Sequence, residues 1–253
     1  MSDALDPRML LRGYAAGIFP MADSRDAGDI FWVEPRTRAI IPLDAFHLSR
    51  SLARRLRSGR FTLTADRAFH DVLLGCADRE ETWINPMIER ATLGLHATGH
   101  AHSIECWHEE KLVGGVYGVK LGRAFFGESM FSRATDASKG ALAGLVARLK
   151  VGGFTLLDCQ FMTDHLASLG AVTISREAYV GSLSAALGST GVSGSGAGVG
   201  AALDAPGAVP LVDGAELPPP DFFALDRLLA APDVAGASGP SGQLIAQLLG
   251  HTS

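Results

Sequence analysis

The sequence lacks several features that would assign it to a functional class at once. It has only three cysteines, Cys76, Cys106 and Cys159, and their spacing fits neither a metal site nor a disulfide framework, so we expect reduced thiols and no metal. No apolar run approaches the ~20 residues that a membrane span needs. The N-terminus, with Asp3 and Asp6, also lacks the basic and apolar regions of a signal peptide. We therefore expect a soluble, cytoplasmic protein with no membrane partner.

Basic charge is also scarce overall, since the net charge is −5 at pH 7, and this balance argues against a nucleic-acid partner. Locally the picture differs, because residues 36–60 contain seven arginines and a single acid. Ser49 can cap a helix in which Arg50, Arg54 and Arg57 fall at i, i+4 and i+7 and form one basic stripe. Such a stripe can be a plain solvated face. Its concentration in an acidic protein favours contact with a phosphate backbone.

Composition divides the chain into three parts. Residues 1–42 are predicted to form a small N-terminal module with a strand near its end, over Ala39–Pro42. Residues 43–185 have the length and apolar content of a main α/β domain. Residues 186–253 are rich in Gly, Ala, Ser and Pro, which indicates a flexible linker and tail. Within this tail, Asp221–Ala231 and Gly242–Gly250 could form short amphipathic helices.

The main domain has a readable order of helices and strands. Asp66 and Asn85 are each predicted to cap a helix, the second of which ends at Gly99. Ser103–Trp107 and Leu112–Val119 then predict a β-hairpin.

The rest of the domain continues with strands and helices. A further strand is predicted over Ala124–Met130, followed by a helix capped by Asp136 and ended by Gly152. Thr155–Phe161 is predicted to return as a strand, followed by a helix capped by Thr163. This order favours an α+β fold of mixed α/β type.

The triplet Asp158-Cys159-Gln160 is where we expect chemistry. On a strand, Asp158 and Gln160 face one way and Cys159 faces the other. This alternation disfavours a nucleophilic triad of Cys159, His165 and Asp158, and His165 is better explained as a structural residue. Asp158 could be only a cap or an ion-pair partner. An acid and an amide together at the end of an apolar strand favour function, because ligands gather at such strand ends in α/β sheets.

Several strings in a fixed order together resemble the leucyl/phenylalanyl-tRNA–protein transferases. They are YAAGIFPM from Tyr14, followed by HAHSIECW, LVGGVYG, FFGESMFSR, DASKGAL, LLDCQ and DHLASLGA, and the resemblance runs to about Tyr179. It implies an N-acetyltransferase-like (GNAT) core, which the predicted element order also matches. It further implies transfer of Leu or Phe, and by pocket shape Met, from aminoacyl-tRNA to proteins that begin with Arg or Lys. Such transfer marks the acceptor for degradation through the N-degron pathway, and needs no cofactor. We expect a monomer.

The same resemblance implies roles for individual residues. Asp158 and Gln160 would orient the acceptor amine and stabilise the developing oxyanion, and Glu128 would contact the acceptor's basic group. The stripe Arg50, Arg54 and Arg57 would bind tRNA. An apolar pocket for the donor side chain would be lined by Trp32, Trp83, Val116, Phe125 and Leu157, which could equally be ordinary core residues.

Three other functions are alternatives to this one. Acyl transfer from coenzyme A is disfavoured, because the connection from Ser129 to Asp136 has no glycine to let a pyrophosphate approach the backbone. A peptidoglycan-type aminoacyl-tRNA transferase would share the fold and the donor, but should accept small amino acids that an apolar pocket holds poorly. A non-catalytic tRNA-binding protein would need only the basic stripe.

Overall fold

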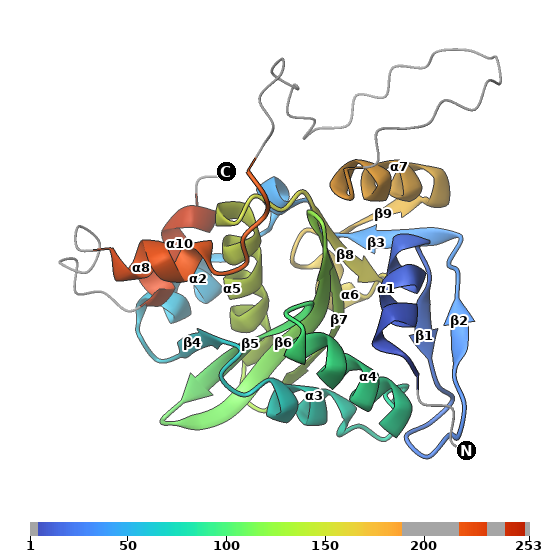
Figure 1. The fold of residues 1–253 in the computed structure, drawn as a ribbon. Helices are drawn as coiled ribbons and strands as arrows, with labels where there is room; N and C mark the ends of the chain where they lie inside the picture. Colours follow the sequence, from blue (N-terminus) through green and yellow to red (C-terminus); the bar gives the residue numbers. More distant parts are fainter. Residues whose placement is uncertain (1–4, 189–217, 232–240, 251–253) are drawn as a thin grey trace, which may run out of the picture.

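A seven-stranded sheet forms the centre of the molecule in the computed structural model, which describes residues 5–188, 218–231 and 241–250 (Figure 1). The strand order is β4-β5-β6-β7-β8-β3-β9. Neighbouring strands are antiparallel except β7 and β8, which are parallel. The strands are β3 (Thr37–Ile40), β4 (Thr62–Ala65), β5 (Ala101–His108), β6 (Lys111–Leu121), β7 (Ala124–Ser132), β8 (Leu156–Gln160) and β9 (Val172–Ser175). The fold is therefore mixed α/β with a mostly antiparallel sheet.

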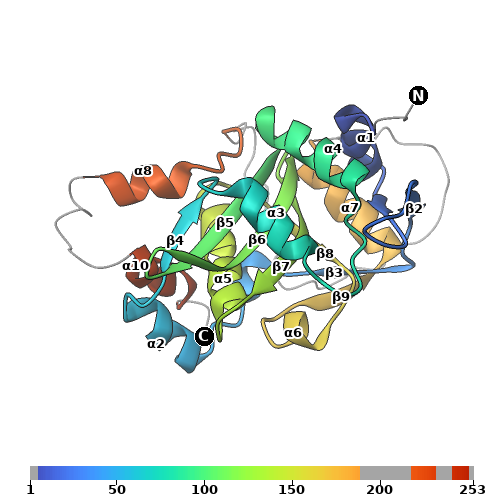
Figure 2. The same ribbon diagram turned by 90° about the horizontal axis from the view of Figure 1, so that it is seen from below.

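Helices cover both faces of this sheet, each over its own apolar cluster. On one face, α5 (Ala137–Val151) packs with α2 (Arg50–Arg57), α8 (Ala224–Ala230) and α10 (Ser241–Leu249) (Figure 2). The other face carries α1 (Pro7–Ala15), α3 (Phe69–Ala77), α4 (Pro86–Ala97) and α7 (Arg176–Ala186). We call these the α5 cluster and the α3 cluster. Successive residues of a strand point to opposite faces, so Phe125 lies in the α5 cluster and Phe126 in the α3 cluster.

The predicted hairpin is confirmed as β5 and β6, which pair from Ala101↔Val119 to His108↔Lys111. Glu109 and Glu110 connect the strands, and both have positive φ, 50° and 63°. A two-residue turn with both φ values positive matches the right-handed twist of an antiparallel pair. Strand β7 extends the predicted strand Ala124–Met130 by two residues, and β8 is one residue shorter at each end than the predicted Thr155–Phe161. Strands β4 and β9 have no counterpart among the predicted strands.

Three of the predicted helix caps are confirmed. The Thr163 hydroxyl accepts a hydrogen bond from the Leu166 amide, 3.2 Å away, at the start of α6 (Asp164–Ala167). The Ser49 hydroxyl accepts a hydrogen bond from the Leu52 amide, 3.3 Å away, at the start of α2. The Asn85 side chain accepts from the amides of Met87 and Ile88 at 3.1 and 3.0 Å, at the start of α4. Each side chain satisfies amides that a helix leaves unpaired in its first turn.

Two other predicted caps are wrong. Asp66 lies before α3 but accepts from the Ser103 amide at 2.8 Å, so it joins β4 to β5 instead of capping the helix. Asp136 precedes α5 with φ 68° and makes no cap hydrogen bond. Its carboxylate pairs with Arg55 of α2 at 3.0 Å. In both places a tertiary partner outweighs the local cap.

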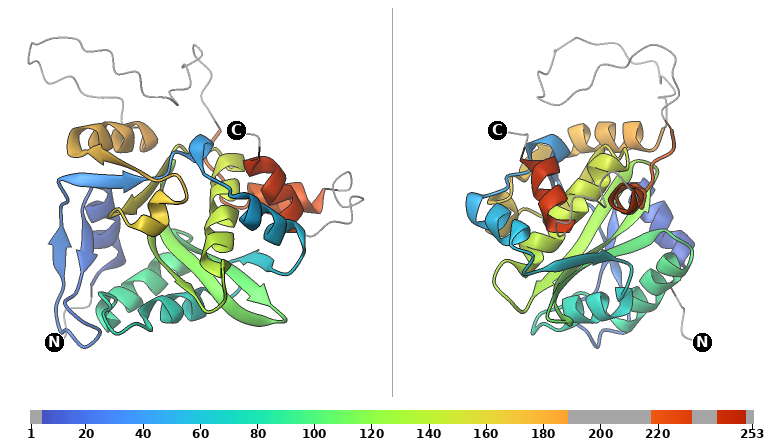
Figure 3. Two further views of the ribbon diagram at one scale, coloured as in Figure 1. Left: turned by 180° about the vertical axis from the view of Figure 1, so that it is seen from behind. Right: turned by 90° about the vertical axis from the view of Figure 1, so that its left-hand side faces the viewer.

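The N-terminal residues add a small second sheet beside the main one. Strands β1 (Phe19–Met21) and β2 (Phe31–Val33) pair with each other and follow α1 (Figure 3). The strand expected near Ala39–Pro42 is β3, and it lies inside the main sheet between β8 and β9. A module ending at residue 42 would therefore include one strand of the main sheet.

Two described parts of the C-terminal tail are packed against the core. Helices α8 and α10 form where the sequence predicts them, and Leu225, Ile245 and Leu249 are buried in the α5 cluster. The expectation of a flexible tail is thereby corrected for these segments. Residues 189–217 and 232–240 lie outside the described residues. Among the described helices, none is long and apolar enough to cross a membrane. The short segments η1 (Leu43–Ala45) and α6 (Asp164–Ala167) complete the fold.

Candidate active site

Asp158 lies at the centre of a buried polar network near the end of β8. Its side chain is fully buried and faces Arg38 of β3, which is also buried. Arg38 Nε donates to Oδ1 and Oδ2 of Asp158 at 2.9 and 3.1 Å, and Nη2 donates to Oδ2 at 2.7 Å. The guanidinium lies between the rings of Phe19 and Tyr179, 4.6 and 4.5 Å from their centroids. This packing fixes the planar fork of Arg38 on the carboxylate.

Two further donors complete the hydrogen bonding of Asp158. The Tyr179 hydroxyl donates to Oδ2 at 2.8 Å, and the backbone amide of Gln160 donates to Oδ1 at 2.8 Å. A carboxylate has about four lone-pair positions, and the two nitrogens of Arg38, the hydroxyl and the amide occupy them. Asp158 is therefore placed to hold its neighbours in position. In this arrangement it has no lone pair left for a substrate.

Gln160 adopts a backbone conformation that residues other than glycine seldom take. Its φ is 63°, in the left-handed region. The hydrogen bond from its amide to Asp158 holds this conformation. The side chain is then directed across to β7, where Nε2 donates to Oε1 of Glu128 at 2.9 Å. Asp158 thus fixes the Gln160 backbone and, through it, the direction of the Gln160 side-chain amide.

Glu128 reaches this position through an irregularity in β7. The register pairs Tyr117 with Ser129 and Gly118 with Gly127, so Glu128 is the extra residue of a β-bulge. Bulges redirect a side chain and are frequent next to active sites. Burial raises the pKa of Glu128 to about 7, although hydrogen bonds from Tyr14 and Gln160 oppose that shift. A carboxyl with this pKa changes charge near neutral pH, and part of the residue remains exposed to solvent.

Cys159 lies on the opposite face of β8, as the alternation predicts. Its side chain packs against the α5 cluster, whereas Asp158 and Gln160 contact Arg38 and Glu128 on the other side. Burial and the nearby charge of Asp158 raise the pKa of the Cys159 thiol. Among the described residues, Cys159 forms no hydrogen bond with His165. The geometry offers no reactive thiolate.

The five residues expected to line the donor pocket fall into two sets. Val116, Phe125 and Leu157 are buried in the α5 cluster. Trp32 and Trp83 are half-buried and pack against the α3 cluster. A single pocket lined by all five is therefore not formed, because the sheet separates the two sets.

The predicted basic stripe is exposed along α2. Arg50, Arg54 and Arg57 face solvent, while Leu52 and Leu56 are buried on the other side of the helix. The structure leaves the three guanidinium groups available to a ligand.

Sequence reasoning missed three residues of the site, Arg38, Tyr179 and Tyr14. Arg38 contacts Asp158 across 120 positions of sequence, and Tyr14 reaches Glu128 from α1. An arginine within the strand-like run Thr37–Ile40 was one available signal, since a buried arginine needs an anionic partner. Nothing in the sequence identifies Asp158 as that partner.

Fold and site together define a mixed α/β protein with a buried ion pair between Arg38 and Asp158. This pair holds the side-chain amide of Gln160 against Glu128, an acid whose pKa is raised. A family model described as leucyl/phenylalanyl-tRNA protein transferase matches residues 40–184, and the model of that family's N-terminal domain matches residues 3–36. The chain belongs to the leucyl/phenylalanyl-tRNA protein transferase family.

Relatives with this name match the whole chain. The leucyl/phenylalanyl-tRNA–protein transferase of Rhizorhabdus wittichii is 59% identical over 99% of both chains. That of Novosphingobium aromaticivorans is 52% identical over 99% of this chain and 97% of its own. Among solved structures, L-PGS from Bacillus licheniformis matches 64% of this chain and 55% of its own, with 15% identity and a TM-score of 0.36. A likeness at that level supports no conclusion about this protein.

Proposed function

We propose that this protein transfers leucine or phenylalanine from aminoacyl-tRNA to the N-terminal Arg or Lys of acceptor proteins. The observation that carries the proposal is the match, over 99% of the chain at 59% identity, to a protein named for this reaction. A methyl-scale misfit in an apolar donor site is worth only ~1–3 kcal/mol, so methionine should also be accepted. The product would enter the N-degron pathway. An aminoacyl-tRNA donor implies a cytoplasmic reaction, and we propose that a monomer performs it.

The order of elements supports a GNAT-like core for this activity. Strands β4 to β7 are antiparallel, α5 follows β7, and β8 then returns parallel to β7. The bulge of β7 and the end of β8 bring Glu128 and Gln160 together, with Gln160 Nε2 2.9 Å from Glu128 Oε1. Substrates of open α/β sheets bind at such strand ends.

The chemistry is aminolysis of an ester that is already activated. The acceptor amine attacks the aminoacyl carbonyl, the bond to the ribose oxygen breaks, and the proton from the amine ends on that oxygen. The α-amine has an ordinary pKa of about 7.7–8.0, so a useful fraction is neutral at physiological pH. Holding amine and ester together therefore supplies most of the rate gain.

Each site residue has a distinct part in this proposal. The Gln160 side chain orients the amine and donates toward the developing oxyanion, and Glu128 contacts the acceptor's basic group once it is ionised. Asp158 acts through Gln160, since its own oxygens are occupied by Arg38, Tyr179 and the Gln160 amide.

Two surfaces are proposed to hold the donor. The exposed stripe of Arg50, Arg54 and Arg57 would contact tRNA phosphates. Trp32 and Trp83 adjoin the segment that carries Tyr14, because Trp32 packs on Gly13 and the Trp83 carbonyl accepts from the Ala22 amide. Both tryptophan rings are apolar and half-buried. We propose them for the donor side chain, and assign Val116, Phe125 and Leu157 to the core beneath the sheet.

The test is a transfer assay with labelled Leu-tRNA and a peptide that begins with arginine. The proposal predicts a peptide extended by one leucine, and much less product when the peptide begins with alanine. Transfer of Ala or Ser to a cell-wall peptide would indicate the peptidoglycan-type reaction instead. Binding of tRNA with no transfer to any acceptor would indicate a non-catalytic protein.

A further inference from the structure

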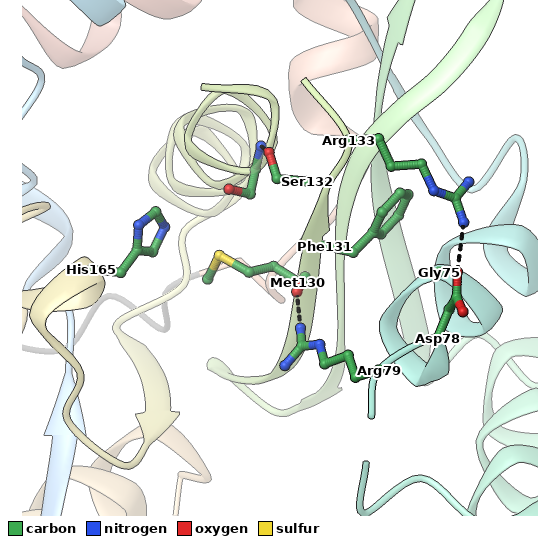
Figure 4. Close-up of a pocket in the computed structure, with 9 residues that line it drawn as sticks. Gly75, Asp78, Arg79, Met130, Phe131, Ser132, Arg133 and His165 are labelled. Atoms are coloured by element: carbon green, nitrogen blue, oxygen red, sulfur yellow. Dashed lines mark hydrogen bonds and ion pairs between the residues drawn. The ribbon is translucent and has the colours of Figure 1, made fainter. Parts of the chain in front are cut away.

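A groove lies beside the proposed catalytic residues, where β7 ends. One hollow of ≈390 Å³ adjoins a second of ≈510 Å³, and the two share Gly75, Asp78 and Arg133. We call the first hollow the β7 groove. It is lined by the end of α3, the end of β7, the first turn of α5, and α6, through Gly75, Asp78, Arg79, Met130, Phe131, Ser132, Arg133, Ser138 and His165 (Figure 4).

Two arginines give the β7 groove its cationic character. All side-chain hydrogen bonds of Arg79 within the described residues leave from Nη2, to the Ser129 hydroxyl at 3.2 Å and to the Met130 carbonyl. The Nε and Nη1 donors of Arg79 thus remain available to a ligand. Arg133 lies over the Phe131 ring and pairs with Asp78 at 3.4 Å, where the Asp78 side chain is 77% exposed. An exposed pair of that length is weak and can exchange for a better anion.

His165 adds an unused polar atom on the other side of Met130 (Figure 4). Its buried Nε2 has no hydrogen-bond partner among the described residues. An unpaired buried nitrogen destabilises the folded protein unless a ligand or solvent satisfies it. Burial and the charge of Lys139 lower the pKa of His165, which agrees with surroundings of positive potential. A bound anion would reverse that effect and accept a hydrogen bond from Nε2.

The position of the β7 groove limits which anion can bind. Met130 follows Glu128 by two residues on β7, a separation of roughly 7 Å along a strand. The reacting ester carbonyl must lie at Glu128 and Gln160 if these residues act on it. The group within one nucleotide of that carbonyl is the phosphodiester on the 5′ side of the terminal ribose.

We propose that the β7 groove binds the last phosphodiester of the donor's 3′ end, through Arg79 and Arg133 with His165 at the far side. The inference rests on the proposed function and specifies how the donor is anchored. Arginine suits this ligand because its planar fork donates two parallel hydrogen bonds to phosphate oxygens. Ser138 would contribute a hydroxyl from the same lining, whereas the Ser132 hydroxyl already donates to the Ala134 carbonyl at 2.9 Å.

Two short donor substrates distinguish the loss of a phosphate contact from a general loss of activity. Leucyl-adenosine carries the ester without a phosphodiester, and the leucyl ester of the dinucleotide CpA carries one. Wild-type protein should use the CpA ester with the higher kcat/KM. Arg79→Gln and Arg133→Gln should each lower kcat/KM for the CpA ester about ten-fold or more, the scale of a lost charged hydrogen bond, and should lower it far less for leucyl-adenosine. Arg79→Lys should recover part of the loss.

Arg90→Gln is the matched control, because Arg90 is exposed on α4 and lies outside the groove lining. It should leave the preference for the CpA ester intact. Equal losses with both donors, or no loss with either, would overturn the assignment. A wild-type protein that transfers from neither ester nor from Leu-tRNA would contradict the proposed function instead. In that case the groove is tested by binding titrations with CpA and with adenosine. An affinity for CpA that is the same in the wild type and in Arg79→Gln would contradict the proposed phosphate site.

Discussion

At the scale of single residues, the candidate site is organised around one carboxylate, Asp158, whose oxygens accept hydrogen bonds from protein donors. Asp158 accepts hydrogen bonds from Arg38 of β3, from Tyr179 of α7 and from the Gln160 backbone amide. The placement of Gln160 therefore depends on where β3 and α7 lie. Breaking a buried charge pair by removing one partner typically destabilises a protein by about 3–5 kcal/mol. The stability and the activity of this protein should therefore respond together at these residues.

Arg38→Lys tests that coupling. Lysine keeps the charge but cannot reproduce the fork on Asp158 or the stacking on Phe19 and Tyr179. We expect kcat to fall about ten-fold through misplacement of Gln160, with little change in KM for tRNA and a lower melting temperature. Tyr179→Phe removes one donor to Asp158 and should show a smaller loss of the same kind. A loss confined to the KM for tRNA would contradict the positioning role.

Glu128 should impose a pH dependence on acceptor use. Its pKa of about 7 means that the carboxyl is neutral below that pH and charged above it, so kcat/KM for an arginine acceptor should rise through about pH 7. A second rise should follow near the amine pKa of about 7.7–8.0. Glu128→Gln should abolish the first rise and keep the second. A pH–rate profile of both proteins measures this, and an unchanged first rise in the variant would contradict the role.

The same shift has a consequence for stability. The folded pKa of Glu128 lies above its ordinary value of 4.5, so the folded state holds this proton more tightly than the unfolded chain does. The associated stabilisation is complete below about pH 4.5 and is lost as the pH rises through about 7. Glu128→Gln should remove this part of the pH dependence of unfolding.

Sequence alone predicted one part of the residue geometry and missed another. The period of two along a strand placed Asp158 and Gln160 on one face and Cys159 on the other, and the structure confirms this. The same period could not reveal that Asp158 is occupied by Arg38, because that pairing depends on β3 lying beside β8. It also could not foresee the bulge that places Glu128 next to Gln160.

At the scale of elements, local signals worked where no distant partner competed with them. Ser49, Asn85 and Thr163 cap helices as predicted. Asp66 and Asp136 instead interact with Ser103 and Arg55. The prediction of one donor pocket failed for a similar reason, since which face of the sheet each residue occupies depends on the strand order.

Helix α2 carries the element-scale prediction. Replacing Arg50, Arg54 and Arg57 with Ala should keep the fold, because the buried side chains of this helix are Leu52, Ala53 and Leu56. Binding of tRNA should weaken, and the slope of log K against log salt should flatten by about 2–3, since each phosphate contact contributes roughly 0.9. Filter binding at several salt concentrations measures both. An unchanged affinity and slope would show that the stripe is only a solvated helix face and does not contact tRNA.

At the scale of the whole molecule, the N-terminal elements and the described parts of the C-terminal tail pack against the main domain. Tyr14 and Phe19 bring the N-terminal elements to Glu128 and Arg38. At the other end, Phe222 is buried between His102 and Phe125, with centroid distances of 4.1 and 5.7 Å. Glycine-rich composition around such segments hides this packing from a reading of the sequence.

Phe222→Ala should therefore destabilise the protein by about 3–5 kcal/mol, as the loss of a buried aromatic side chain does. Activity at low temperature should be largely retained, because Phe222 contacts neither Gln160 nor Glu128 among the described residues. Phe223→Ala is the matched control, since that neighbouring ring is 39% exposed and should matter less. Urea unfolding of the three proteins measures the difference, and equal stability of wild type and Phe222→Ala would show that the segment is not part of the core.

The central claim is that transfer occurs at the face of β8 formed by Asp158 and Gln160. Its most direct test is kcat for leucyl transfer from Leu-tRNA to an arginine peptide in three variants of adjacent residues. We predict that Asp158→Asn and Gln160→Ala lower kcat by roughly ten-fold or more, the scale of a lost positioning group or oxyanion donor. Cys159→Ala should lower stability with activity largely kept. Loss of transfer activity in Cys159→Ala and after thiol alkylation of the wild type, with activity retained in Asp158→Asn, would contradict the account.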